Sequence, residues 1–282
     1  MAANLVRAGY PVSVWNRTAA KMTSLQALGA VACSSPAQAA ESADIVIFMM
    51  ENGAVVAEVL THAIAALSPA ALVIDMSSTS QSEALALHAT LAQRAIAALD
   101  APVSGGVIGA QTATLAIMVG GASDCFLRAQ PVLEKLGRVT LVGGPGAGQV
   151  AKLCNQLIVG ATLNIVAEAL LLAQSAGADP AAVRRALRGG FAESRILEVH
   201  GQRMLERDFR PGGQIKSQSK DLDNVLQAAA DAGLQLPIAA LVREQFHCLL
   251  GAVPTADQSA ILLAVEQANP GCRLGDIPDR LP

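Results

Sequence analysis

Aromatic side chains are scarce in this chain, at 2% of its 282 residues. Proteins that bind single-stranded nucleic acid stack bases on such rings. Binding to a phosphate backbone also needs clustered Lys and Arg side chains, and no cluster of that size occurs in this chain, whose net charge is -3. We therefore expect no nucleic-acid partner.

Paired cysteines and metal-binding patterns are absent as well. The five cysteines are odd in number, widely spaced and without a CxxC pair, and the four histidines show no ligand spacing. This pattern predicts reduced thiols and no metal site. The N-terminal segment also lacks a basic start followed by an apolar core of signal-peptide length, so we expect a cytoplasmic protein.

An uninterrupted apolar run long enough for a bilayer is also missing. Hydrophobic residues reach 52% and the mean hydropathy is +0.42, but charged residues are spread over the whole length. The most apolar stretch, Leu157 to Leu172, is too short to span a bilayer and contains Asn164 and Glu168. It is predicted to be a buried helix, and no membrane partner is expected.

The first half of the chain alternates short apolar runs with amphipathic stretches. This alternation is typical of βαβ units and predicts a Rossmann-like α/β fold with a doubly wound parallel sheet. The predicted strands cover residues 12–15, 45–49, 72–75, 95–99, 115–119 and 139–142.

From residue 149 the alternation stops, and helical patterns fill the rest of the chain. We therefore expect a nucleotide-binding domain over residues 1–148 and an all-α substrate and oligomerisation domain over residues 149–282. A long interdomain helix is predicted over residues 149–175, because the apolar pattern continues without a break to a glycine stop after Ser175.

The expected sheet lacks one signature. A dinucleotide-binding sheet begins with a strand and a GxGxxG turn that precede the first helix, and here the helix that leads to Val12 starts near Met1. We therefore expect the sheet to lack its first strand and the 1–148 domain to be truncated at its N-terminus. Because the backbone N–H groups of that turn bind the pyrophosphate, weak cofactor binding is the expected consequence.

Two glycine-rich segments point to a site. In the first, Ser104, Gly105 and Gly106 follow a hydrophobic run, where a strand can end in bare backbone that a small anion approaches. The second ends a short strand in a glycine turn and opens a long helix with Lys152 in its first turn. The positive helix N-terminus disfavours the ammonium form of a lysine there, which tunes the side chain toward proton transfer.

Lys152, Asn155 and Gln156 are spaced i, i+3 and i+4 on this helix, so they share one face. Polar side chains gathered where two domains join form a hypothesis for a binding or catalytic site.

The residues after the first predicted strand bear on the cofactor. A nucleotide-binding fold contacts the adenosine ribose at this point, and an acidic residue there would receive a ribose hydroxyl. The chain has Asn16, Arg17, Thr18 and Lys21 instead. Cationic side chains suit a 2′-phosphate, so NADP is favoured over NAD.

Five segments, in their order and spacing, resemble the β-hydroxyacid dehydrogenase family: WNRTAAK, IDMSST, DAPVSGGVIGA, GAGQVAKLCNQ and SKDLDNVLQAA. The family includes 3-hydroxyisobutyrate dehydrogenase, tartronate semialdehyde reductase (2-hydroxy-3-oxopropionate reductase), and reductases of glyoxylate or succinic semialdehyde. Within it, KLCNQ, RALRGG and TADQSAI are most similar to the tartronate semialdehyde reductase branch. The resemblance covers essentially the whole chain.

The resemblance implies a role for each candidate residue. Lys152 matches the family's catalytic lysine, which exchanges a proton with the carbonyl or hydroxyl oxygen of the substrate. Ser104, Gly105 and Gly106 match the segment that holds the substrate carboxylate, and the polar pair beside the lysine is matched by Asn155 and Gln156. The implied cofactor contacts are Asn16, Arg17, Thr18, Met49, Met50, Glu51, Ser78 and Lys220.

These roles imply an NAD(P)H-dependent oxidoreductase that interconverts a short 3-oxo acid, tartronate semialdehyde, and its hydroxy acid, glycerate. The alternatives within the family are a 3-hydroxyisobutyrate dehydrogenase and a glyoxylate or succinic semialdehyde reductase. An alternative of another class is a truncated, non-catalytic oligomeric binding protein. The long apolar helix and the abundant aliphatic surface predict a homodimer or homotetramer.

Overall fold

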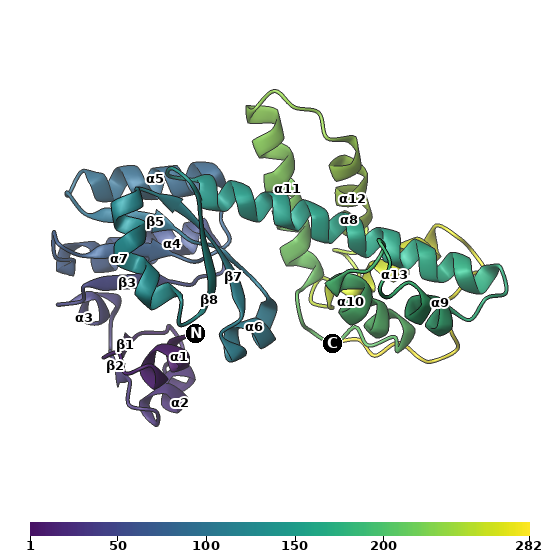
Figure 1. The fold of residues 1–282 in the computed structure, drawn as a ribbon, viewed down its shortest axis with the longest axis horizontal. Coiled ribbons are helices and arrows are strands. Elements are labelled where there is room, and N and C mark those ends of the chain that lie inside the picture. The colour runs from purple at the N-terminus through teal and green to yellow at the C-terminus, as the bar shows by residue number, and fades with distance from the viewer. The chain divides into compact units, whose positions relative to one another are not determined.

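The computed structural model describes residues 1–282. The chain divides into two compact units, Met1–Lys152 and Leu153–Pro282. Every strand belongs to the first unit, and the second consists of helices and their connections (Figure 1).

Three parallel strands form one side of the main sheet of the first unit. They are β3 (Ile45–Phe48), β4 (Leu72–Asp75) and β5 (Ala97–Asp100), paired in that order. All four residues of β4 are buried, as expected for a strand that is covered on both faces. Its side chains alternate between two cores, with Leu72 and Ile74 in one and Val73 in the other. The predicted Rossmann-like sheet is confirmed in these strands.

The sheet continues through a strand of opposite direction. Strand β7 (Leu115–Gly121) is antiparallel to β5 and to the short β6 (Val103–Ser104), while β8 (Gly137–Gly143) is parallel to β7. The prediction of parallel pairing was therefore wrong for β7. The physical reason is the short connection from β5, which contains only β6 and helix α6 (Gly106–Thr112). It returns the chain near the end where β5 stops, so β7 enters the sheet from that end.

A second, smaller sheet contains β1 (Ser13–Val14) and β2 (Val31–Ala32), which pair in parallel. The short helices beside it are α1 (Ala2–Arg7), η1 (Ala19–Met22), α2 (Thr23–Gln26) and α3 (Pro36–Ala40). Helix α1 contributes Leu5 to the core that also holds Leu72 and Ile74.

Side-chain caps fix the starts of the helices that follow β3 and β4. Helix α4 (Gly53–Ala63) begins after Asn52, whose side chain accepts a hydrogen bond from the Val55 N–H at 3.0 Å. Helix α5 (Gln81–Ala92) has a capping box made by Ser80 and Glu83. Helix α7 (Ser123–Leu133) packs Ala129 and Leu133 into the core of β4 and β5.

Helix α8 (Ala147–Ser175) begins in the first unit and continues into the second, and the boundary falls after Lys152. Its length and hydropathy alone match those of a membrane span. In the second unit, however, it supplies the core residues Leu163, Val166, Ala167, Leu170 and Leu171. The core helix of a globular unit has the same composition, and this is how the second unit uses it.

The second unit surrounds this part of α8 with shorter helices. They are α9 (Pro180–Ala186), α10 (Arg195–Leu205), α11 (Ile215–Asp231), α12 (Pro237–His247), η3 (Gln258–Ala260) and α13 (Ile261–Gln267). Asp179 caps α9 by accepting from the Ala181 N–H at 2.9 Å, and Pro180 is its first residue. Helix α11 starts at Ile215 and carries no side-chain cap.

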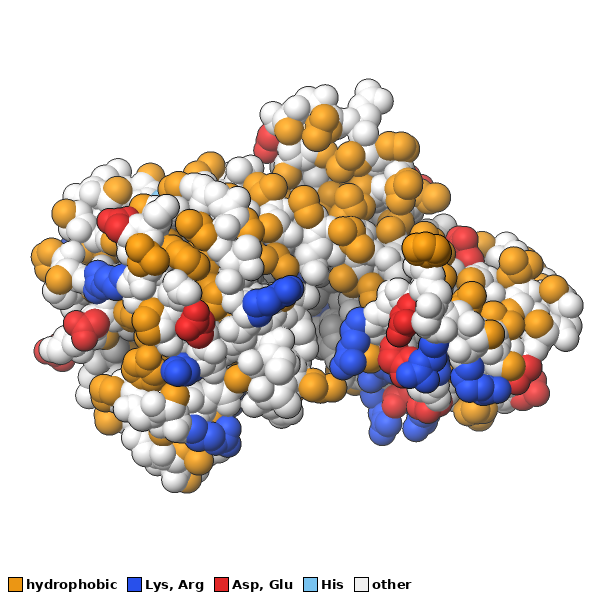
Figure 2. All heavy atoms as spheres, in the orientation of Figure 1, with side chains coloured by type: hydrophobic (Ala, Val, Ile, Leu, Met, Phe, Trp, Pro, Cys, Tyr) orange, Lys and Arg blue, Asp and Glu red, His pale blue; other side chains and the backbone are white.

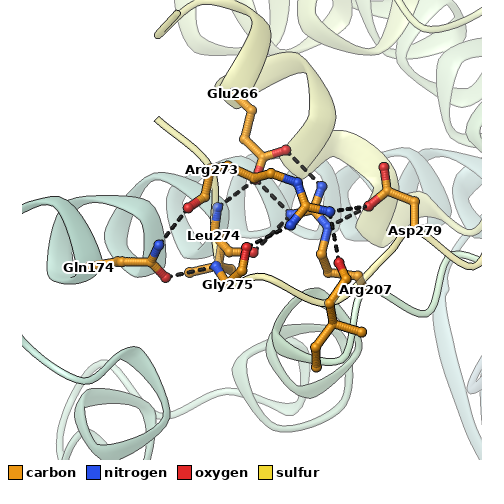
Figure 3. Close-up of polar contacts among 8 residues, drawn as sticks. Gln174, Arg207, Glu266, Arg273, Leu274, Gly275 and Asp279 are labelled. Atoms are coloured by element: carbon orange, nitrogen blue, oxygen red, sulfur yellow. Dashed lines mark hydrogen bonds and ion pairs between the residues drawn. The ribbon is translucent and has the colours of Figure 1, made fainter. Parts of the chain in front are cut away.

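A buried arginine connects the C-terminal segment to the rest of the second unit through hydrogen bonds (Figure 3). Arg207 is 1% exposed, and its guanidinium donates to both carboxylate oxygens of Glu266 at 2.7 and 2.9 Å. It also donates to the Leu274 carbonyl at 3.0 Å and to Asp279. These partners raise the pKa of Arg207 against the opposing effect of burial, so the guanidinium stays charged in the folded protein.

Candidate active site

The first turn of α8 is held by a carboxylate from strand β5. Asp100, the last residue of β5, is fully buried. Its Oδ1 accepts from the Gly146 N–H at 2.8 Å, and its Oδ2 accepts from the Gln149 N–H at 2.9 Å. The first N–H groups of a helix have no partner within the helix, and the helix dipole favours a negative charge there. Asp100 therefore caps α8.

Lys152 lies in α8 and is 9% exposed. Because α8 starts at Ala147, Lys152 is in its second turn, and the sequence argument that placed it in the first turn was wrong. The cap from Asp100 allows the helix to start before residue 149. The electrostatic effect of a helix N-terminus falls off within the first turn, so the dipole acts on this ammonium group less than the sequence implied.

The second unit brings Asn155 and Gln156 together with helix α11. The Asn155 Nδ2 donates to the Gln156 Oε1 at 2.8 Å. The Gln156 Nε2 donates to Asp221 Oδ2 at 2.7 Å and to Gln218 Oε1 at 3.0 Å, and the Gln218 Nε2 returns to the Gln156 carbonyl at 2.8 Å. Lys220 joins this cluster through a 3.2 Å ion pair with Asp221.

Sequence reasoning missed Gln218 and Asp221, which are both buried. Two signals were available. Asp221 directly follows Lys220 in the KDL motif, and Gln218 precedes Asp221 by three residues, which places the two on one face of a helix.

Ser104 ends the short strand β6, and Gly105 and Gly106 follow it with φ of +136° and +62°. These values favour glycine, and a Cβ at Gly105 would lie 3.2 Å from Leu115 Cδ2. The sequence predicts that a strand ends here in bare backbone. Gly105 is the N-cap residue of α6, and Gly106 is the first residue of this helix. Both glycines are exposed, and Ser104 is half-buried.

The candidate cofactor residues after β3 and β4 lie together. The Met50 N–H donates to Ser77 Oγ at 2.8 Å, and the Ser77 N–H donates to Asp75 Oδ1 at 2.9 Å. Met49 and Glu51, which flank Met50, are exposed, and Ser78 is half-buried. This is the carboxyl end of two parallel strands, where open α/β sheets bind their ligands.

Burial raises the pKa of Asp75 to about 6, and the negative charge of Asp100 adds to this effect. Hydrogen bonds from Ser77 act in the opposite direction. Two carboxylates, Asp75 and Asp100, thus lie buried at the ends of neighbouring strands.

Asn16, Arg17 and Thr18 follow β1 and so belong to the smaller sheet. They are exposed, and the Thr18 N–H donates to Asn16 Oδ1 at 2.9 Å, which closes the turn. Lys21 is exposed in η1. Arg17 and Lys21 are two exposed cationic side chains on one short segment, and such side chains can bind a phosphate group. The loops after β3 and β4 lie where this fold binds a dinucleotide.

Comparison with known proteins identifies the family. Residues 1–144 match the NAD-binding domain of 6-phosphogluconate dehydrogenase, and residues 146–265 match the NAD-binding domain of NADP-dependent 3-hydroxyisobutyrate dehydrogenase. The chain belongs to the β-hydroxyacid dehydrogenase family. The chain is therefore an NAD(P)-dependent oxidoreductase.

Individual relatives agree with this assignment. The chain is 44% identical over 271 residues to the 2-hydroxy-3-oxopropionate reductase of Escherichia coli, an alignment that covers 94% of this chain and 92% of the relative. It is 34% identical to a probable 3-hydroxyisobutyrate dehydrogenase-like protein of Arabidopsis thaliana, with 95% and 82% covered.

Among solved structures, the 3-hydroxyisobutyrate dehydrogenase of Mycobacterium tuberculosis with L-serine superposes with a TM-score of 0.85. It is 31% identical, and 94% of each chain is covered. A 3-hydroxyisobutyrate dehydrogenase of Salmonella typhimurium gives the same TM-score at 28% identity, with 93% of this chain and 94% of the other covered. The fold, a Rossmann-like sheet unit followed by a helical unit, is therefore that of the family.

Proposed function

We propose that this protein reduces tartronate semialdehyde to glycerate. The observation that carries the proposal is Lys152, a largely buried lysine on a helix whose first turn is fixed to the end of β5. The 44% identity to the Escherichia coli 2-hydroxy-3-oxopropionate reductase supports this choice of substrate.

In the proposed reaction, Lys152 donates a proton to the carbonyl oxygen of the substrate and accepts it in the reverse direction. Ser104, Gly105 and Gly106 bind the substrate carboxylate, and Asn155 and Gln156 hold the substrate's polar groups beside the lysine. NAD(P)H, when bound, supplies the hydride.

For the cofactor, we propose NADP rather than NAD, on the strength of Arg17, Thr18 and Lys21. The further proposed contacts are Asn16, Met49, Met50, Glu51, Ser78 and Lys220. The hydrogen bond from Met50 to Ser77 supports this set, since it holds two of the loops side by side at the carboxyl end of the sheet. We assign cofactor binding to residues 1–148, and substrate binding and oligomerisation to residues 149–282.

The direct test of the substrate is a comparison of kcat/KM for tartronate semialdehyde reduction with kcat/KM for 3-hydroxyisobutyrate oxidation. The second reaction is the competing candidate, supported by the 31% identity to the Mycobacterium tuberculosis enzyme. We expect tartronate semialdehyde to be preferred. Preference for 3-hydroxyisobutyrate, or for glyoxylate or succinic semialdehyde, would reject the substrate assignment and leave the enzyme class intact.

We further propose that the protein is a cytoplasmic homodimer or homotetramer. Ile158, Ile165 and Leu172 follow one another at intervals of seven residues on α8, so they form one stripe, and each is more than 60% exposed. Figure 2 shows further hydrophobic side chains on the surface around α11 and α12, where Leu234 in their connection and Ile238 and Leu241 on α12 are exposed. Aliphatic surface of this kind supports burial against a second copy.

Light scattering tests the assembly. We expect Ile165→Glu to reduce the molar mass of the wild-type oligomer, because it places a charge in the centre of the α8 stripe. The control is Leu127→Glu, since Leu127 is 65% exposed on α7 in the other unit. A monomeric wild type would reject the proposal.

A further inference from the structure

We propose that Asp100 and Gln149 are positioning residues. They fix the distance of the first turn of α8 from the sheet and its rotation about the helix axis, and hence the position of Lys152. The inference rests on the proposed role of Lys152. It assigns a function to two buried polar residues that sequence reasoning did not select.

Asp100 is itself held rigidly. It is paired with Asp75 in the parallel ladder of β4 and β5, and with Gly120 in the antiparallel ladder of β5 and β7. A third donor, His88 Nε2, lies 3.3 Å from Asp100 Oδ1. Asp100 is thus held by the pairing of β5 with two neighbouring strands and by a side chain of α5. Its carboxylate can therefore keep α8 at a fixed distance from the sheet.

The contact between helix and sheet is too close for any side chain at two positions. A Cβ on Gly148 would lie 2.5 Å from the Asp100 carbonyl oxygen and 2.6 Å from that of Met118. A Cβ on Gly120 would lie 2.6 Å from Asp100 Oδ1 and from the Gly148 nitrogen. The first turn of α8 therefore packs directly on the backbone of β5 and β7, and Asp100 fills the remaining space.

Gln149 supplies the second connection. Its Oε1 accepts from the Thr79 N–H at 3.1 Å, and its Nε2 donates to the Ser77 carbonyl at 2.8 Å. Gln149, Ser77 and Thr79 are at most 3% exposed. Gln149 thus donates its backbone N–H to Asp100, and its side chain binds the two residues that flank Ser78.

The two residues together connect three parts of the proposed site. Asp100 leads directly into the segment that contains Ser104, and Gln149 holds the loop around Ser78. Lys152 follows Gln149 by three residues, about one helical turn. A rotation of α8 that moves Lys152 must therefore break buried hydrogen bonds to Asp100 at the end of β5 and to the loop that contains Ser77 and Thr79. Misplacement of a catalytic group by about 1 Å can cost about 100-fold in rate.

The experiment uses two variants of the full chain and one control. Asp100→Asn keeps the shape of the side chain but turns an amide N–H₂ toward one of the two backbone donors, which loses its acceptor. Gln149→Met keeps the side-chain length and removes both side-chain hydrogen bonds. The control is Asp179→Asn, which makes the same Asp-to-Asn change at the N-cap of α9, a helix that carries no residue of the proposed site.

We expect kcat with tartronate semialdehyde and NADPH to fall about 10- to 100-fold in both test variants. We also expect the limb of the kcat–pH profile that reports Lys152 to move, because a displaced lysine has different neighbours. The Asp179→Asn variant is expected to keep the wild-type kcat and profile. If Asp100→Asn does not fold, as judged by circular dichroism, Gln149→Met decides the question alone.

Wild-type kcat in the folded variants would overturn the inference. A loss of kcat without a shift of the kcat–pH limb that reports Lys152 would also overturn it, because it would indicate a structural role only. Lys152→Ala separates this failure from failure of the proposed function. If Lys152→Ala abolishes turnover while Asp100→Asn and Gln149→Met do not, only the positioning role is rejected. If Lys152→Ala retains turnover, the proposed function itself is rejected.

Discussion

Replacement of Arg207 by methionine should destabilise the second unit more than any surface change. The guanidinium is buried and bonded to Glu266, Asp279 and the Leu274 carbonyl, so its removal leaves two carboxylates with a lost partner. Breaking one side of a buried ion pair costs about 3–5 kcal/mol. For a unit of this size, each kcal/mol corresponds to about 3 °C in Tm, so we expect a fall of about 10 °C.

Differential scanning calorimetry measures this effect. The matched control is Arg210→Met, because Arg210 pairs with Asp208 at 2.8 Å on an exposed part of the same unit. Exposed pairs contribute little, so the control should melt close to wild type. A double variant, Arg207→Met with Glu266→Leu, should regain part of the lost stability, since an apolar pair can replace a buried ion pair. Equal melting of Arg207→Met and wild type would refute the reasoning.

Three further predictions concern the first unit. Asp75 has a raised pKa of about 6 when folded, so its contribution to stability is complete below pH 3.8 and is lost as the pH rises through 6. The free energy of unfolding of Asp75→Asn, measured in urea, should therefore increase relative to that of the wild type as the pH rises between these values. A difference in free energy that does not change with pH would contradict the assignment. Gly148→Ala should lower both Tm and kcat, because its Cβ overlaps two carbonyl oxygens. Arg17→Ser should raise KM for NADPH about tenfold while KM for NADH changes little.

Local signals in the sequence were sufficient for much of the fold. The apolar run over Leu72–Asp75 gave the buried central strand, and Asp179 with Pro180 marked the start of α9. The long apolar pattern up to Ser175 gave α8. Each of these elements is determined by periodicity or by a cap within a few residues of the element itself.

Elements that depend on distant contacts were not predicted. Strands β2 and β6 have two residues each, too few for any periodicity, and exist only through pairing with β1 and β7. The direction of β7 follows from a short connection and not from its own residues. Helix α6 starts at glycines, which in sequence indicate a turn.

The candidate site shows the same division. Lys152 stood out because of the glycine-rich segment before it, but its helical turn was misjudged, since the cap comes from Asp100, about fifty positions earlier in the chain. Asp221 was missed because a carboxylate beside a lysine in a helix is ordinarily solvated. Its burial and its hydrogen bond to Gln156, on another helix, distinguish it.

The most direct test of the account is the turnover of Lys152→Ala with tartronate semialdehyde and NADPH, with Lys135→Ala, an exposed lysine of the same unit, as control. General acid–base catalysis contributes about 100- to 10,000-fold, so kcat should fall by at least about 100-fold. Circular dichroism and NADPH binding, followed through Trp15 fluorescence, should stay at wild-type values. A kcat for Lys152→Ala that matches that of Lys135→Ala would contradict the central claim.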